Sequence, residues 1–165
     1  MSNLPSDYTG KGLESYVIDT REYAGEITME VKPEDIVAVC NTLKSALGFD
    51  YLSDITGIDY YTDSKRFGLA YNLVSLASKK RIRILARVNE SDPVIDSVTG
   101  VWPAANWFER EVFDMVGVKF AGHPDLRRMF MPEDFEYHPL RKEFPLIGIP
   151  GSIQMPEKDP PKEYR

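Results

Sequence analysis

Alternating hydrophobic and polar residues predict a β-sheet in the first part of the chain. The stretches 15–20 and 26–31 alternate on either side of a glycine-containing turn, which is typical of a β-hairpin. Residues 51–60 and 67–76 are rich in β-branched and aromatic side chains, which favour strands. Residues 81–88 alternate most regularly. We therefore expect about five strands, with 67–76 and 81–88 joined as a second hairpin.

The strand expected at 81–88 has one hydrophobic face and one cationic face, because successive side chains of a strand point to opposite sides. The inward set is Ile82, Ile84, Ala86 and Val88, and the outward set is Arg81, Arg83 and Arg87. This pattern indicates a sheet with one face in the core and the other in solvent. In the strand at 51–60, Gly57 is a candidate β-bulge.

Two segments have the start and stop signals of helices. One spans 33–47, begins with proline and acidic residues, and ends before Gly48. Its hydrophobic stripe consists of Ile36, Val39, Cys40, Leu43 and Leu47. The other lies between Pro103 and Gly117. Two helices packed on a mostly antiparallel sheet make an α+β fold.

The second helix carries three acidic residues. Glu111 shares a face with hydrophobic side chains, so if buried it requires a cation or strong hydrogen-bond donors. The hydrophobic residues on that face are Ala104, Trp107, Phe108 and Met115, and the candidate cations are Arg127, Arg128 and Arg141. The alternative is that Glu111 reaches solvent at the helix edge. Glu109, Glu111 and Asp114 could supply acid/base chemistry, although no substrate pocket is indicated. The alternative for Glu109 and Asp114 is a solvated helix face near Arg110.

The segment after this helix, residues 118–147, combines repeated prolines with many hydrophobic residues, and we call it the strap. Its prolines exclude a helix or a central strand. A long irregular segment with hydrophobic anchors is typical of a binding loop. We interpret the strap as a docking segment whose cationic pairs bridge to another chain. Those pairs are Arg127–Arg128 and Arg141–Lys142, and the alternative is that they are solvated surface cations.

These patterns divide the chain into four parts. Residues 1–13 are expected to be a flexible arm and residues 14–117 a single α+β domain. The strap follows, and residues 148–165 are expected to be an extended proline-rich tail ordered only by a partner.

Composition narrows the function. A net charge of −6 argues against a broad nucleic-acid surface. No stretch approaches the roughly 20 apolar residues of a membrane helix, and the first residues lack a signal or transit pattern, so we expect a cytoplasmic or cytoplasm-facing protein. The single cysteine, Cys40, excludes an intrachain disulfide and an intrinsic iron–sulfur cluster.

Motifs for phosphate binding or catalysis are absent from the sequence, which contains no GxGxxG, GxxxxGK[ST], CxxC or HExxH. His123 and His138 are each followed by proline. A two-histidine metal site with Asp125, Asp134 or Glu136 is one interpretation. The other is that each imidazole bonds to a carboxylate or a backbone carbonyl and rigidifies a turn. The residues alone favour a cofactorless subunit over an enzyme.

The string EREVFDMVGVKFAGHPDLRRMFMPEDF, followed by HPLRKEFP, closely resembles the signature of the C (30 kDa) subunit of respiratory NADH:quinone oxidoreductase, complex I. Upstream, SDITGIDY, LAYNLVSL, RIRILARV and SVTGVWPAANWFERE are also similar to that family. The resemblance covers roughly residues 26–147. Tyr137 departs from it, because the family typically has glycine there. If the family's glycine has a positive φ, Tyr137 marks a locally altered turn.

The resemblance implies a structural subunit, without a redox centre of its own, in the hydrophilic arm of a proton-translocating NADH:quinone oxidoreductase. It would lie against the D (49 kDa) subunit and near the B and I subunits, on the cytoplasmic side of the bacterial inner membrane. The B and I subunits would hold the terminal iron–sulfur clusters, and FMN and the other clusters would belong to further partner subunits. The interface positions implied are Glu109, Arg110, Glu111, Asp114, His123, Asp125, Arg127, Arg128, Asp134, His138, Arg141 and Lys142.

Two other functions remain open at this point, besides a scaffold that has lost its complex. The first is the equivalent subunit of a related membrane-bound hydrogenase or of a ferredoxin- or F420H2-linked dehydrogenase. The second is a stand-alone enzyme using His123 and Asp125, which predicts turnover by the isolated chain.

Overall fold

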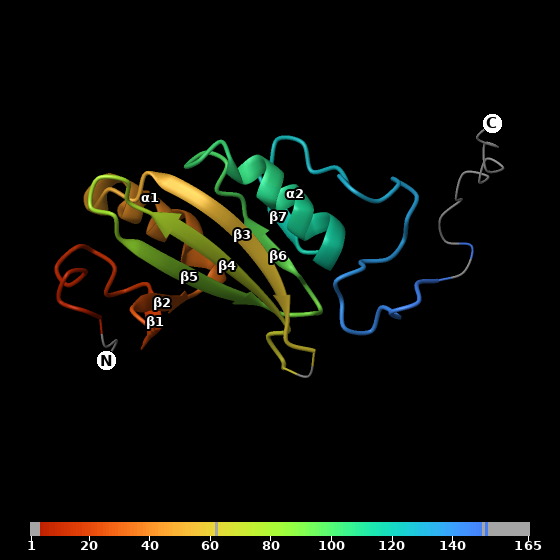
Figure 1. Cartoon of the computed structure of the whole chain (residues 1–165), viewed down its shortest axis with the longest axis horizontal. Helices are drawn as coiled ribbons and strands as arrows, with labels where there is room; N and C mark the ends of the chain where they lie inside the picture. Colours follow the sequence, from red (N-terminus) through yellow and green to blue (C-terminus); the bar gives the residue numbers. More distant parts are fainter. Residues whose placement is uncertain (1–3, 62, 150, 152–165) are drawn as a thin grey trace, which may run out of the picture.

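The computed structural model describes residues 4–61, 63–149 and 151. A single five-stranded sheet, in the order β1-β2-β5-β4-β3, forms the centre of the domain (Figure 1). Its strands are β1 (Val17–Tyr23), β2 (Glu26–Val31), β3 (Tyr51–Asp59), β4 (Phe67–Val74) and β5 (Arg81–Val88). Every neighbouring pair is antiparallel except β2 with β5, which is parallel. The α+β fold with a mostly antiparallel sheet of five strands is therefore confirmed.

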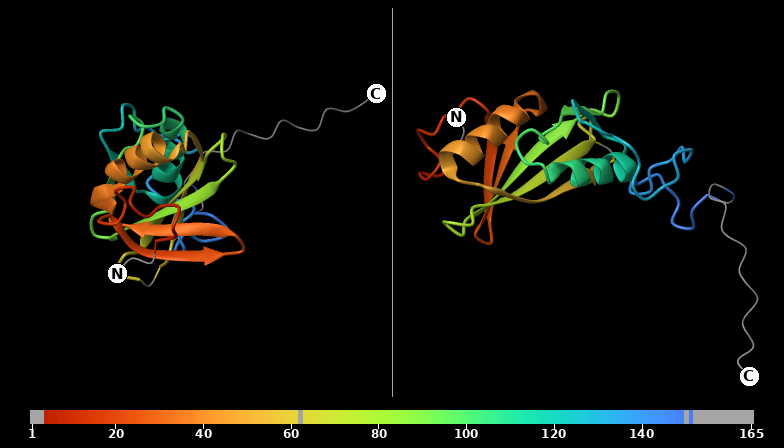
Figure 2. Two further views of the ribbon diagram at one scale, coloured as in Figure 1. Left: turned by 90° about the vertical axis from the view of Figure 1, so that its left-hand side faces the viewer. Right: turned by 90° about the horizontal axis from the view of Figure 1, so that it is seen from above.

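Two helices, α1 (Ile36–Leu47) and α2 (Ala105–Val116), pack on the same face of the sheet (Figure 2). A short 3-10 helix, η1 (Pro33–Asp35), leads into α1. Both helices end where the glycines predicted: Gly48 has φ 70° and Gly117 has φ 85°, the left-handed conformation that terminates a helix. Cys40 on α1 is completely buried as a free thiol.

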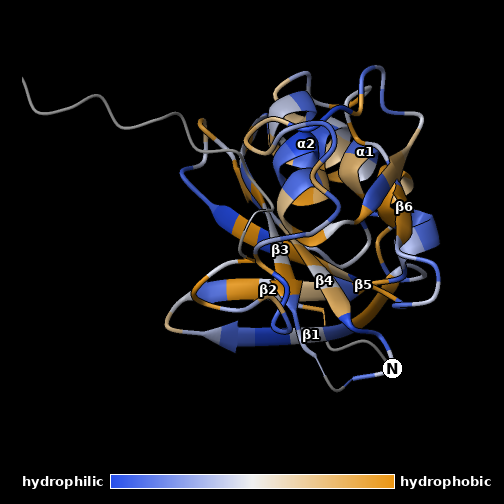
Figure 3. Cartoon of the chain, turned by 90° about the vertical axis from the view of Figure 1, so that its right-hand side faces the viewer, coloured by the Kyte–Doolittle hydropathy of each residue, from blue (hydrophilic) through white to orange (hydrophobic). Residues whose placement is uncertain are grey.

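The strands face the helices as their alternation predicted. Ile82, Ile84, Ala86 and Val88 of β5 are buried. The outer strand β1 is largely hydrophilic towards its C-terminal end (Figure 3). Its hairpin with β2 turns at Ala24 and Gly25, both with positive φ.

Gly57 has a different role from the one expected. The irregularity of β3 lies between Leu52 and Asp54 rather than at Gly57. A Cβ atom on Gly57 would stand 2.8 Å from Val116 Cγ2 and 3.0 Å from Val112 Cγ1 of α2. Glycine at this position therefore allows α2 to sit directly on β3.

Short elements and the N-terminal segment depart from the sequence-based expectation. β6 (Val94–Asp96) and β7 (Lys119–Ala121) pair in parallel. The sequence predicted a polar connection without a strand where β6 lies, and no strand in the strap, where β7 lies. Three-residue strands are too short to show a period.

The segment expected to be a flexible arm contributes two side chains to the core: Tyr8 and Leu13 are 3% and 0% exposed. Their hydrophobic anchoring outweighs the polar, glycine-rich composition around them.

The strap leaves the domain beside the C-terminal end of α2 (Figure 1), and β7 is the one helix or strand that its described residues contain. The prediction for the tail falls almost wholly outside the described residues, which stop at 151. Within the described part of the chain, neither helix is long or hydrophobic enough to span a bilayer.

Candidate partner interface

Asp114 of α2 organises the turn of the strap that follows Arg128. Its Oδ2 accepts hydrogen bonds from the backbone amides of Met129, Phe130 and Met131 at 2.9, 2.7 and 3.0 Å. Its Oδ1 accepts a hydrogen bond from Arg128 Nη1 at 2.7 Å. Burial alone would raise the pKa of Asp114, but these donors outweigh it and hold the pKa below its usual value. The expectation of a solvated Asp114 was wrong: the residue is 0% exposed, because donors from a distant segment satisfy the carboxylate.

The strap also caps the C-terminal end of α2, where backbone carbonyls lack partners within the helix. Four strap residues donate to these carbonyls. Asp114 O accepts from His138 Nδ1 (3.0 Å) and Arg128 Nη1 (3.2 Å), Met115 O accepts from Leu140 N (2.9 Å), and Val116 O accepts from Arg141 Nε (2.7 Å). Burial lowers the pKa of His138, which favours the neutral imidazole, and because Asp114 O can only accept, the ring hydrogen is on Nδ1. The strap is therefore part of the helix terminus.

Gly117 makes this capping possible. A Cβ atom there would lie 2.5 Å from both Arg141 Nη2 and His138 Nε2, in addition to the strain of a positive φ. A side chain at this position would force the strap away from the helix end.

A buried ion-pair network fixes the later part of the strap to the sheet. Arg66, whose side chain is 5% exposed, donates to both oxygens of Asp59 at 2.8 Å and also pairs with Glu90 (2.6 Å) and Glu143. The Arg66 hydrogen bonds hold the pKa of Asp59 well below its usual value. Asp59 Oδ2 also accepts the backbone N–H of Lys142 at 2.8 Å. Lys142 thus contributes its amide here, while the residue itself is exposed.

Asp59 and Arg66 were not predicted from the sequence as members of the site. One sequence signal could have found this ion pair: Asp59 and Arg66 stand at the two ends of the turn that joins the strands predicted at 51–60 and 67–76. A short turn of this kind brings its ends together, and the hydrogen bond from Tyr60 N to Arg66 O (2.9 Å) closes it.

Glu109 is a second buried carboxyl of α2, and it too was wrongly expected on a solvated face. Its Oε1 accepts the Val98 amide and its Oε2 accepts the Ser97 hydroxyl, each at 2.7 Å. Burial raises the pKa of Glu109 to about 7. The residue is 0% exposed and anchors the loop before α2 to the helix.

His123 completes this buried cluster. Its Nε2 lies 3.2 Å from Asn106 O and 3.9 Å from Glu109 Oε2, and its Nδ1 accepts the Asp125 amide at 3.0 Å. Both ring nitrogens are therefore engaged by the chain, and the imidazole is 0% exposed. This agrees with the interpretation that each histidine bonds a backbone carbonyl. Among the described residues, no group of three or more histidine, cysteine or acidic side chains is placed to hold a metal ion.

The two remaining arginines of the predicted interface, Arg110 and Arg127, are bonded within the chain. Arg110 donates to the carbonyls of Arg127 and Arg128 at 3.0 and 3.3 Å and stacks on Trp107, 5.2 Å from the ring centroid. Arg127 forms a two-bond ion pair with Asp125, at 2.7 Å for each bond, on the exposed surface.

Glu111 is exposed. The interpretation that it is buried beside an arginine is therefore wrong, and the alternative, that it reaches solvent, is confirmed. The face of α2 on the sheet is instead the one that carries Glu109, Val112 and Val116, because Gly57 admits the helix there. Asp134 is exposed as well. Neither Glu111 nor Asp134 has an ion pair within the described part of the chain.

The outer side of the strap exposes large hydrophobic side chains. They are Phe130 (57% exposed), Leu140 (57%), Leu146 (107%) and Ile147 (93%). Beside them, Tyr137 has no positive φ, and its ring packs against Phe135 and Phe144 with centroids 5.6 and 6.3 Å away. Exposed hydrophobic groups on a segment whose backbone is held internally are typical of a surface that binds another protein.

Comparison with known proteins identifies relatives along most of the chain. Residues 29–149 match the family model described as respiratory-chain NADH dehydrogenase, 30 Kd subunit. The C subunit of the NADH-quinone oxidoreductase of Geobacter metallireducens is 51% identical over 82% of this chain and 83% of its own. A relative from Rhizobium meliloti, the C 2 subunit of its NADH-quinone oxidoreductase, is 52% identical over 78% of this chain and 71% of its own.

Two solved structures share the fold. One is a trypsin-resistant fragment (1–134) of Nqo5, with a TM-score of 0.63, 34% identity, and coverage of 70% of this chain and 93% of that one. The other comes from an archaeal membrane-bound sulfane sulfur reductase, with a TM-score of 0.71 and 82% coverage of each chain. At 22% identity this second likeness concerns the fold alone. The family match and the sequence relatives together show that the chain belongs to the respiratory-chain NADH dehydrogenase 30 kDa subunit family.

Proposed function

We propose that the chain is a cofactorless structural subunit of the hydrophilic arm of a proton-translocating NADH:quinone oxidoreductase. It supports the quinone-reducing module beside the D (49 kDa) subunit and near the B and I subunits. FMN and the iron–sulfur clusters reside in partner subunits of the complex. The subunit is peripheral, on the cytoplasmic side of the bacterial inner membrane. Family membership and the names of the relatives support this proposal.

The observation that carries the docking role is the two-sided character of the strap. Its inner side is hydrogen-bonded to Asp114, Asp59 and the end of α2. Its outer side leaves Leu140 and Ile147 exposed. A backbone that is already held in place loses little conformational entropy on binding, so the exposed hydrophobic groups contribute more of their burial to affinity.

The positions carried over from the family divide into two groups by their surroundings. The supporting group acts inside the chain and consists of Glu109, Arg110, Asp114, His123, Arg128, His138 and Arg141. The outward group is exposed and consists of Glu111, Asp125, Arg127, Asp134 and Lys142. We propose that the outward group and the hydrophobic side chains of the strap contact the partner subunits, while the supporting group shapes the surface.

Purification of the tagged subunit from mildly solubilised native membranes tests this proposal. Leu140→Asp and Ile147→Asp place a charge in the docking surface and should abolish recovery of the 49 kDa-type subunit and of NADH:quinone activity. Tyr23→Asp, at an 85% exposed position in the β1–β2 hairpin, is the matched control and should leave both unchanged. Normal recovery of the complex with both strap variants would contradict a docking role for the strap.

A related complex is the second candidate, because the fold also occurs in an archaeal respiratory membrane complex. The same purification distinguishes the two: hydrogenase-type partners in place of NADH dehydrogenase subunits would assign the chain to the related complex. The structure does not favour a stand-alone enzyme built on His123, because both nitrogens of that buried ring are occupied by the chain itself.

A further inference from the structure

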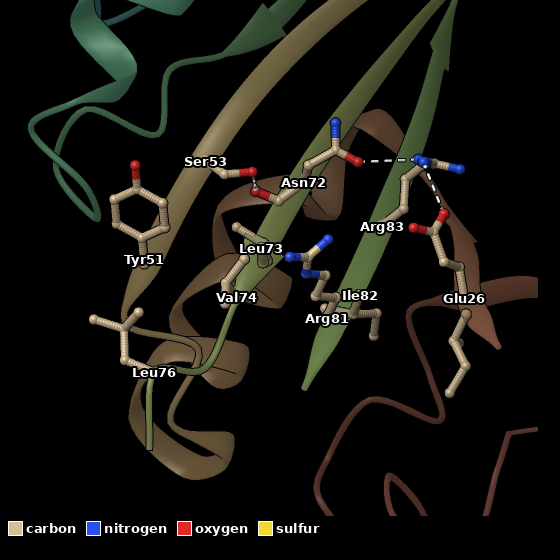
Figure 4. Close-up of a pocket in the computed structure, with 11 residues that line it drawn as sticks. Glu26, Tyr51, Ser53, Asn72, Leu73, Val74, Leu76, Arg81, Ile82 and Arg83 are labelled. Atoms are coloured by element: carbon tan, nitrogen blue, oxygen red, sulfur yellow. Dashed lines mark hydrogen bonds and ion pairs between the residues drawn. The ribbon is translucent and has the colours of Figure 1, made fainter. Parts of the chain in front are cut away.

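A hollow of about 460 Å³ lies on the sheet face opposite the helices, formed by β2, β3, β4 and β5 (Figure 4). It is at the end of the sheet remote from the strap (Figure 1). We propose that this hollow is a second docking site, which receives an extended acidic segment of a neighbouring subunit. A carboxylate of that segment lies on Arg81, and an aliphatic or aromatic side chain next to it lies on Leu76.

Cationic side chains occupy one side of the hollow. Arg81 is exposed, and its side chain has no hydrogen bond or ion pair within the described residues. Arg83 is oriented by Asn72 Oδ1, at 3.0 Å from its Nε, and by Glu26 at 3.2 Å (Figure 4). The chain as a whole has a net charge of −6, so a hollow with two guanidinium groups is a local exception. An unpaired guanidinium recognises a carboxylate through two parallel hydrogen bonds.

Hydrophobic side chains form the opposite side. Tyr51 is 50% exposed and Leu76 is 62% exposed, and the half-buried Val74 lies between Tyr51 and Arg81 in the strand register. Leu76 is held in its exposed position, because its amide donates to Asp50 Oδ1 at 3.0 Å and the Ser75 amide closes the hairpin loop on Lys80 O at 2.9 Å. The exposure of this leucine is therefore a feature of the folded turn.

The open shape of the hollow fits an extended protein segment better than a small-molecule ligand. Pockets for small molecules bury about 70–90% of the ligand surface. This hollow is open along one side and lies across several strands, so it can cover one face of an extended chain but cannot enclose a small anion. The inference rests on the proposed function in one respect, namely that this chain has neighbouring subunits. It assigns them a contact separate from the strap.

Photocrosslinking in the intact complex tests the proposal. Leu76 is replaced by p-benzoylphenylalanine, and a second preparation carries the same probe at Leu140 on the strap. After irradiation of native membranes, position 76 should give an adduct with another subunit, and mass spectrometry should locate the crosslink in an acidic segment. Arg81→Glu should lower the yield of this adduct at least about fivefold, since a charge pair becomes a repulsion. Lys79→Glu, in the same exposed turn but outside the hollow, should leave the yield unchanged.

Several outcomes would overturn the inference. One is an adduct from position 140 with none from position 76. Others are an adduct at position 76 that is indifferent to Arg81→Glu, or one formed with a second copy of this chain. Failure of position 140 as well, with no other subunit recovered, would refute the proposed function itself and remove the basis of the second site with it.

Discussion

Replacement of Asp114 by asparagine is the most direct test of how the strap is held. The change keeps the size of the side chain but removes its charge. The introduced amide can still present one oxygen to the three strap amides, so its nitrogen must then face the Arg128 guanidinium, and two donors oppose each other.

The magnitude follows from the hydrogen bonds that Asp114 accepts. Hydrogen bonds to charged groups contribute about 1.5–3 kcal/mol and neutral ones about 0.5–1.5 kcal/mol, so each of the four side-chain bonds loses roughly 1 kcal/mol. Water reaching the half-exposed strap amides compensates for part of this, and we expect a net loss of about 3 kcal/mol in the free energy of unfolding. For a chain of this size the midpoint of thermal unfolding should fall by about 6–12 °C.

The assay combines thermal unfolding of the isolated chain with hydrogen exchange at residues 129–131. Exchange at those amides should accelerate in the variant more than exchange in the core strands, because the strap opens before the domain. Asp125→Asn is the matched control: it removes an acid from an exposed ion pair, which should change stability by less than about 1 kcal/mol. An unchanged midpoint, together with wild-type protection of residues 129–131, would refute the reasoning.

The pH dependence provides an independent check on the same residue. The pKa of Asp114 is depressed in the folded chain, so its contribution is fully present above the ordinary aspartate pKa of about 3.9 and is lost as the pH falls through the folded-state value. The stability difference between wild type and Asp114→Asn should therefore be constant near neutrality and shrink below about pH 4.

Three further predictions concern other residues of the site. Gly117→Ala should destabilise the chain by more than about 2 kcal/mol. Gly122→Ala is the control: Gly122 has a similar φ of 78° but open space around it, so this variant should lose only the roughly 1 kcal/mol of backbone strain. Equal midpoints of thermal unfolding for the two variants would contradict the clash with Arg141. The pKa of Glu109 is raised to about 7, so its favourable contribution to stability is present below the unfolded pKa of about 4.3 and is lost as the pH rises through 7. Across this window the wild type should lose up to about 3 kcal/mol of unfolding free energy relative to Glu109→Gln. Parallel pH–stability curves of the two proteins, measured by chemical denaturation, would rule this out. Glu111→Gln should change the unfolding free energy by less than about 0.5 kcal/mol, and a larger loss would show that this exposed carboxylate has a structural partner.

The elements with a clear local signal could be predicted from the sequence. The alternation in β5 and the proline and glycine at the ends of α2 determine structure through neighbouring residues, and both predictions hold. The two-stranded ribbon of β6 and β7 could not be found in this way, because three residues carry no measurable period.

The candidate site shows where local reasoning stops. The proline and hydrophobic content of residues 118–147 identified the strap as an important segment. The solvated position was wrong for two acidic residues of α2, however: Glu109 and Asp114 are buried. For Glu111 the sequence left burial and exposure open, and the residue is exposed. The donors to Glu109 and Asp114 come from the loop at 97–98 and from the strap amides, both remote in sequence from the helix positions that they satisfy. Helical periodicity counts a carboxylate as polar and cannot detect donors supplied by another segment.

The capping of α2 by the strap connects binding to stability. The carbonyls of Asp114, Met115 and Val116 receive their hydrogen bonds from the same segment whose outer side we assign to the partner. A partner that binds only the closed strap lowers the free energy of the folded chain by RT ln(1 + [L]/Kd), about 2.7 kcal/mol when its concentration is one hundred times Kd. The unassembled chain is then the least protected form, with a helix end that opens whenever the strap detaches. A cell that degrades partly unfolded proteins would remove this subunit when it is made in excess, so the supply of its partner sets how much of it persists.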